Sequence, residues 1–246
     1  MNRDSHIVSS FDDDLNQLET LLLEMGALVE SQIANAAKAL NRRNVRVGEK
    51  VIIADKAIDN LEHEIDNCTV RILALRSPKA QDLRMVVIAP KIAANLERIG
   101  DYCKNIAKRV NVLANGRQLD SADLTIEAMN EFVQEMVHDV LESLIRKDQE
   151  LASDVRLRDK NVDQMHNTLF RELLTHMMED PRSISECMHL LFIAKNIERM
   201  GDHATSIAEK VHYLVSGEIL EDERPKSDTT SSTTIDSDDA DNLKRD

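Results

Sequence analysis

The chain contains two copies of one helical pattern, and this duplication constrains its fold more than any other feature. The segment NLERIGDYCKNIAKRV, residues 95–110, returns 101 residues later as NIERMGDHATSIAEKV, residues 196–211. Upstream of it, DKAID at 55–59 returns as DKNVD at 159–163, an offset of 104. Self-similarity at a nearly fixed offset indicates that each copy forms a similar structural unit.

Apolar residues in both copies follow helical spacing. In the third helical segment of the first copy they alternate steps of four and three, at Ile92, Leu96, Ile99, Cys103, Ile106, Val110 and Leu113. The predicted core positions of the second segment are Val51, Ala54, Ile58, Leu61, Ile65, Cys68 and Ile72. This spacing is typical of helices that pack along a seam. Breaks are expected at Asn44 and Gly48, Ser77-Pro78, Asn115-Gly116, Lys147-Asp148, Asp180-Pro181 and Gly217.

The predicted fold class is therefore all-α, with two tandem three-helix bundles related by internal duplication. The first bundle is expected over residues 10–117 and the second over 118–217. Residues 218–246 lack apolar periodicity and hold ten acids and four bases. A segment of this composition has too little apolar surface to offset its ordering entropy, so a disordered acidic tail is predicted.

The composition excludes several classes of function. A net charge of -14 repels nucleic-acid backbones, and no stretch combines basic with aromatic residues, so no direct binding to nucleic acid is expected. The longest apolar runs, such as MVVIAP at 85–90, are too short to span a membrane. Three cysteines without CxxC spacing, and a start without a signal peptide, favour the reducing cytoplasm.

Acidic residues recur at matched positions of both copies. The third helix of each copy carries a glutamate and an aspartate four residues apart, and the second helix carries two aspartates with the same spacing. We name the carboxylates of the first copy site 1 (Asp55, Asp59, Glu97 and Asp101) and those of the second copy site 2 (Asp159, Asp163, Glu198 and Asp202). Like charges at this spacing destabilise a helix by roughly 0.2–0.5 kcal/mol. Four carboxylates converge in each copy if its second and third helices lie side by side, and such a cluster calls for cations.

A glycine lies inside each third helix, at Gly100 and Gly201. Each glycine costs about 1 kcal/mol relative to alanine in a helix interior. This cost suggests that something approaches the helix backbone closely at both positions.

The sequence thus favours metal binding over a merely solvated acidic surface. Carboxylate ligands select hard or borderline ions such as iron, manganese, magnesium or calcium. Zinc is an alternative because His166 and His203 lie near site 2. With Leu96 at heptad position a, Glu97 and Asp101 take positions b and f, so both sites are expected on the outer surface.

Two alternatives stay open at this point. Glu-x-x-His spacings occur at Glu135-His138, Glu186-His189 and Glu209-His212, which are typical of ferritin-like di-iron carboxylate proteins. Those proteins aim their ligands into the bundle core, whereas Glu135, His138, Glu209 and His212 are predicted to point outward. The other alternative is a metal-free helical adaptor. No phosphate-binding loop or nucleophile signature occurs, so the chain is not expected to be an enzyme.

The motifs LERIGD and IERMGD, each preceded by a helix with DKxxD, and the stretch DLRMVVIAPKIAANLERIGD closely resemble the PhoU family of phosphate transport system regulatory proteins. The resemblance covers about residues 10–217. Pro90 departs from the family pattern, in which a helix former usually precedes the Lys-Ile pair.

This resemblance implies paired E/DxxxD motifs that hold surface metal clusters, with the residues of sites 1 and 2 as ligands. It also implies a cytoplasmic homodimer that represses phosphate uptake and the phosphate starvation response. The implied partners are the phosphate ABC transporter and its sensor histidine kinase.

Overall fold

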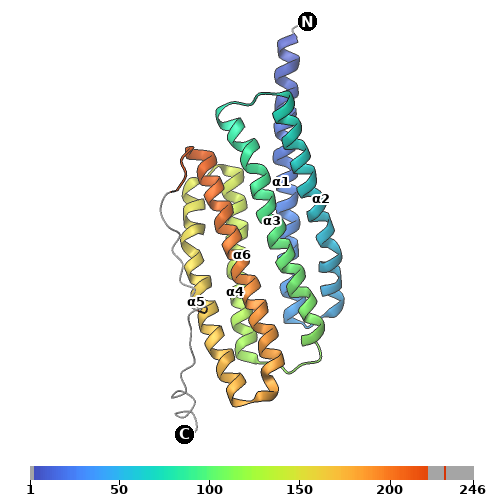
Figure 1. The fold of residues 1–246 in the computed structure, drawn as a ribbon, viewed down its shortest axis with the longest axis vertical. Coiled ribbons are helices and arrows are strands. Elements are labelled where there is room, and N and C mark those ends of the chain that lie inside the picture. Colours follow the sequence, from blue (N-terminus) through green and yellow to red (C-terminus); the bar gives the residue numbers. More distant parts are fainter. Residues whose placement is uncertain (1–2, 221–229, 231–246) are drawn as a thin grey trace.

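The computed structural model describes residues 3–220 and Thr230, and these residues form long helices and no strand (Figure 1). The helices are α1 (Arg3–Asn41), α2 (Val45–Leu75), α3 (Ala80–Leu113), α4 (Asp120–Arg146), α5 (Gln149–Glu179), the 3-10 helix η1 (Pro181–Ser183) and α6 (Ile184–Ser216). The all-α prediction is confirmed. The predicted tail falls mostly on residues 221–229 and 231–246, which lie outside the described residues.

Local sequence signals account for the helix ends. The side chain of Asn44 accepts the backbone N–H of Val47 at the start of α2, and Asp148 caps the start of α5 in the same way. Gly217 has a φ of 77°, the left-handed conformation that commonly ends a helix, directly after α6. Gly48, however, lies inside α2, and α3 continues through Pro90.

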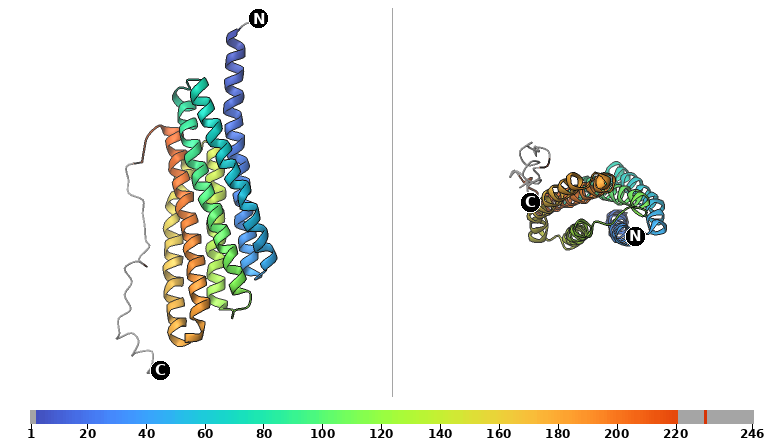
Figure 2. Two further views of the ribbon diagram at one scale, coloured as in Figure 1. Left: turned by 45° about the vertical axis from the view of Figure 1, so that its right-hand side comes forward. Right: turned by 90° about the horizontal axis from the view of Figure 1, so that it is seen from below.

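The six helices form two layers (Figure 2). Seen from the end, α2, α3, α6 and α5 stand in a curved row, and α1 and α4 pack against one side of it. Within the row α3 and α6 run antiparallel to each other (Figure 1). One hydrophobic core includes buried residues from all six helices, so the two copies share an extensive interface. The boundary expected at residues 117 and 118 falls in the linker between α3 and α4, and the division into separate domains stays a prediction.

The contact between α3 and α6 brings matched positions of the two copies together. Tyr102 lies against His203, which is the residue at its own position in the second copy, 101 residues later. The Tyr102 hydroxyl is 3.5 Å from Nε2 of His203, and the ring centroids are 5.6 Å apart. Nδ1 of the same histidine lies 2.8 Å from Oδ1 of Asn95. Helices α3 and α6 therefore contact each other near these residues, which lie close to the middle of both helices.

Two arginines fasten the linker between the copies. Arg43, in the α1–α2 turn, donates to the carbonyl oxygens of Leu113 at 2.6 Å and Gly116 at 3.2 Å, and to the carboxylate of Asp123 at 3.2 Å. This side chain thereby joins the end of α3, the linker and the start of α4.

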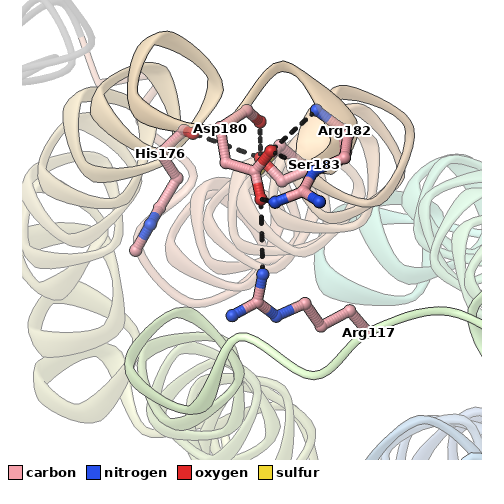
Figure 3. Close-up of polar contacts among 6 residues, drawn as sticks. Arg117, His176, Asp180, Arg182 and Ser183 are labelled. Atoms are coloured by element: carbon pink, nitrogen blue, oxygen red, sulfur yellow. Dashed lines mark hydrogen bonds and ion pairs between the residues drawn. The ribbon is translucent and has the colours of Figure 1, made fainter.

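Arg117, in the linker itself, reaches Asp180 at 3.4 Å (Figure 3). Asp180 also accepts from the backbone and guanidinium of Arg182, and these bonds lower its pKa. The Ser183 hydroxyl donates to the carbonyl of Asp180 at 2.8 Å, so the α5–α6 turn is held by short polar contacts (Figure 3).

Two buried glycines give a matched test of the helix packing. A Cβ built on Gly48 would lie 3.2 Å from the backbone oxygen of Ala107, whereas one on Gly26 would meet the tip of the Leu141 side chain at 2.8 Å. Alanine gains about 1 kcal/mol of helix propensity at either position. The Leu141 side chain can change its rotamer without moving a helix, whereas the Ala107 backbone cannot. Gly26→Ala should therefore stabilise the protein by up to about 1 kcal/mol. Gly48→Ala should destabilise it because α2 must move away from α3. Urea unfolding of both variants checks this order, and equal stabilities would contradict it.

Candidate functional site

Each site lies between two neighbouring helices of the curved row. Site 1 is built on α2 and α3, and site 2 on α5 and α6. A Cβ on Gly100 would lie 3.5 Å from Oδ1 of Asp55, and a Cβ on Gly201 would lie 3.3 Å from Oδ1 of Asp159. The groups that approach the glycines are therefore the first aspartate of the neighbouring helix and the apolar residue one turn on, Ile58 or Val162.

The expectation that these carboxylates lie on the outer surface is wrong for half of them, whereas Glu97 and Asp101 are partly exposed. Four of the eight residues are at most 5% exposed, namely Asp55, Asp159, Asp163 and Glu198. A heptad pattern describes a helix that is packed along one face. Helices α3 and α6 instead pack against several neighbouring helices, so residues on their other faces are buried too. In α2 the predicted core residue Ala54 is exposed and Asp55 is buried instead. Asp55 thus occupies the buried position on α2 that the apolar pattern had assigned to Ala54.

A lysine holds site 1 together. Nζ of Lys104 lies 2.5 Å from Oδ2 of Asp55 on α2 and 3.3 Å from Oδ1 of Asp101 on α3. These contacts raise the pKa of Lys104 to about 12, chiefly through the bond to Asp55. Burial nevertheless raises the pKa of Asp55 above its usual value, because desolvation outweighs the lysine's attraction. Our sequence reasoning missed Lys104, although its position three residues after Asp101 places both on one helix face.

Glu97 shows how crowded the acidic groups of site 1 are. Burial, followed by the negative charge of Asp101, raises the pKa of Glu97 to about 7, and the nearby Arg98 only partly offsets this. Close to neutral pH a proton therefore neutralises part of the charge of site 1. The Lys104 ammonium neutralises another part.

Site 2 has different neighbours. Nζ of Lys195, on α6, lies 2.9 Å from Oε1 of Glu198, and this lysine too was missed from the sequence. His166, on α5 one turn after Asp163, is 3% exposed. The position that matches Lys104 is Thr205, which is fully buried and whose hydroxyl has no hydrogen-bond partner among the described residues. The two copies have therefore diverged at the position of the bridging lysine.

The donor chemistry of the two sites differs in its fit to a metal ion. Site 2 offers buried carboxylates on facing helices together with the imidazole of His166, which are ligands for iron, manganese, magnesium or zinc. In site 1 an ammonium already bridges the two helices. Over residues 3–220, no three His, Cys, Asp or Glu side chains are grouped closely enough to hold a metal ion as they stand. Metal binding at the eight predicted ligands stays a prediction and requires carboxylates to rotate towards a common point.

The Glu-x-x-His pairs do not meet in one core site. Glu135 and His138 are exposed on α4, and Nδ1 of His138 lies 2.8 Å from Oε1 of Glu30 on α1. His189 contacts Arg109. His212 is buried, contrary to the predicted outward position, and Nε2 lies 2.7 Å from the amide nitrogen of Gln149. These separate contacts do not resemble the shared centre of a di-iron bundle.

The fold and its paired acidic sites define a class of duplicated three-helix-bundle proteins, in which α3 and α6 join the two copies. A family profile described as the PhoU domain matches residues 22–110 and 126–211, one segment in each copy. The chain belongs to the PhoU family. No helix in the described part of the chain is long and apolar enough to cross a membrane.

Relatives match the chain over nearly its whole length. The phosphate-specific transport system accessory protein PhoU homolog of Caulobacter vibrioides is 44% identical over 226 residues, which cover 92% of this chain and 98% of the relative. The protein of that name from Xylella fastidiosa is 43% identical over 231 residues, covering 94% of this chain and 95% of the relative. The crystal structure of PhoU from Pseudomonas aeruginosa superimposes with a TM-score of 0.82 at 39% identity, covering 85% of this chain and all of that one.

A second solved structure, the phosphate transport system regulatory protein PhoU from Streptococcus pneumoniae, superimposes with a TM-score of 0.79 at 29% identity. It covers 86% of this chain and 99% of its own. The PhoU fold is therefore shared across chains of quite different sequence.

Proposed function

We propose that this chain is a cytoplasmic negative regulator of phosphate uptake and of the phosphate starvation response. It acts as a homodimer on the phosphate ABC transporter and on the sensor histidine kinase that responds to phosphate. The observation that carries this proposal is the match of both copies to the PhoU domain, together with near-complete coverage of accessory proteins of phosphate-specific transport. A role in phosphate transport follows from the family, and the negative sign and the two partners are our extension of it.

The charge of the chain supports action through protein contacts. A net charge of -14 disfavours the approach of nucleic acid, so control of gene expression is expected to pass through another protein. The PhoU family is regulatory, and four of the eight site residues here are buried carboxylates. Catalysis is not part of the proposal.

Metal ions are the proposed cofactor of this regulation. Asp159, Asp163, Glu198 and Asp202 would hold iron, manganese, magnesium or zinc at site 2, with His166 as a further ligand. A bound cation would offset the repulsion of these carboxylates and fix α5 against α6. The surface that the partners meet would then depend on metal occupancy.

A metal-free helical adaptor is the second candidate. The ion pairs of Lys104 with Asp55 and of Lys195 with Glu198 favour it, since both bring an internal cation to the carboxylates. Elemental analysis of protein purified without added metal or chelator separates the two candidates. Stoichiometric metal that Asp202→Asn removes supports the first, and its absence supports the second.

Deletion of the gene tests the regulatory proposal. In phosphate-rich medium the deletion strain should keep phosphate uptake and phosphatase expression switched on, because the repressing contact with the transporter and kinase is lost. Uptake of labelled phosphate and phosphatase activity measure both effects, and a plasmid copy of the wild type serves as the control. Normal uptake and normal repression in the deletion strain would refute the proposal.

A further inference from the structure

We propose that Lys104 is the resident cation of site 1 and keeps metal ions out of the first copy. The inference rests on the proposed function in one respect, since it assumes that carboxylate sites of this kind attract metal ions. It goes further by assigning unequal roles to the two copies. Site 1 is closed by an ammonium that contacts carboxylates on both of its helices. The metal response is assigned to site 2, where Lys195 pairs with Glu198 on the same helix.

The position of the ammonium carries this inference. Lys104 bridges the two helices that build site 1, with Nζ in contact with Asp55 on one side and Asp101 on the other. The Asp55 side chain is 3% exposed and that of Lys104 is 28% exposed, so the bond to Asp55 lies at the inner end of the site. An ion that approached from solvent would meet the lysine before it reached the buried carboxylate.

A metal ion and this ammonium compete for the same oxygen atoms. A divalent ion coordinated by Asp55 and Asp101 would displace Nζ from its two acceptors, and a retained ammonium beside the ion would repel it. Displacement would also break a charge-assisted hydrogen bond that is largely protected from water. Lys104 therefore lowers the affinity of site 1 for every cation, whatever the metal.

The second copy supplies the internal comparison. Thr205 stands at the position that matches Lys104 and brings no charge to site 2. The carboxylates otherwise occur at equivalent positions in both copies, and both copies have the glycine against the first aspartate. Lys104 is thus a difference at the centre of two sites whose carboxylates match, although site 2 also differs in having His166 and Lys195.

Manganese binding to the full chain tests the proposal. Bound Mn²⁺ would be counted by equilibrium dialysis and electron paramagnetic resonance for the wild type, Lys104→Gln, Asp101→Asn and Asp202→Asn, with circular dichroism as the check on folding. Glutamine keeps a donor for Asp55 without the charge. We expect Lys104→Gln to bind more Mn²⁺ per chain than the wild type, with at least about tenfold higher affinity at the added site. Asp101→Asn should remove that added binding from Lys104→Gln and leave wild-type binding unchanged.

The reciprocal variant places the lysine in the second copy. Thr205→Lys should bind less Mn²⁺ per chain than the wild type, and so should Asp202→Asn. If the buried lysine prevents folding, Asp202→Asn reports on site 2 alone and Lys104→Gln still tests site 1. Binding by the wild type that Asp101→Asn reduces would overturn the inference.

The outcomes separate this inference from the proposed metal function. Metal on the wild type, lost in Asp202→Asn, supports the proposed function, while the gain in Lys104→Gln over the wild type supports the inference. A wild type that binds Mn²⁺ with no gain in Lys104→Gln sinks the inference and leaves the function standing. If Lys104→Gln binds Mn²⁺ and the wild type does not, the inference stands and the proposed metal function is rejected. If neither protein binds Mn²⁺, both are rejected.

Discussion

Replacing Lys104 by methionine should lower the free energy of unfolding by roughly 2–4 kcal/mol in the presence of chelator. The change leaves the Asp55 carboxylate buried without the ammonium that lies 2.5 Å from it. The loss is smaller than for a fully buried pair because the Lys104 side chain is 28% exposed and because Asp55 can take up a proton. For a chain of this size the melting temperature should fall by roughly 5–15 °C.

A double-mutant cycle separates the ion pair from general damage to the helix. Asp55→Asn should cost less than Lys104→Met, because the lysine that remains still reaches Asp101 and solvent. The double variant should be close in stability to Asp55→Asn alone, since the charge that was left unpaired is gone. Additive losses in the double variant would show that the two side chains act independently.

Replacing Arg43 by methionine should destabilise the protein by roughly 2–3 kcal/mol. The Arg43 side chain is 12% exposed, and its guanidinium donates to the carbonyl of Leu113 at the end of α3, to the carbonyl of Gly116 in the linker and to Asp123. Methionine fills similar space and leaves those acceptors without their donor. The linker over residues 114–119 should then open more often, so limited proteolysis should cut it faster than in the wild type.

The neighbouring arginine offers the matched control. Arg42 is exposed at the start of the same turn, and Arg42→Met should change the stability by less than about 0.5 kcal/mol. Urea unfolding of both variants provides the comparison. Equal stabilities of the two would show that Arg43 does not fasten the linker.

The fold was predictable from sequence because its main signals are local. Apolar spacing of three and four residues identified the long helices, and Pro78, Gly116 and Gly217 lie in loops or at helix ends, as expected. The break predicted at Gly48 failed for a reason that no local signal carries. Because Gly48 has no side chain, α3 can approach it closely at Ala107, a residue 59 positions later in the sequence.

The sequence was sufficient to identify the carboxylates of the two sites, but not their burial or the lysine that contacts them. Repetition of the acidic pairs identified the carboxylates, and the glycines indicated a close approach to the backbone. The burial of Asp55 on α2 and Glu198 on α6 depends on which helices pack against these two helices, which a heptad pattern does not encode. Lys104 carried no repeated signal at all, because its counterpart in the second copy is a threonine.

The contact of Tyr102 with His203 bears on the history of the chain. Contact between a residue and its own counterpart is what a two-fold axis between two like surfaces produces. The α3–α6 contact thus has the geometry expected if two identical three-helix ancestors that paired face to face were joined by gene duplication and fusion. In such an ancestor each position on the axis had to tolerate itself as a neighbour, and any change was made on both sides at once. In one fused chain the two sides can differ, as they do where Tyr102 meets His203 and where one acidic site has a lysine and the other a threonine.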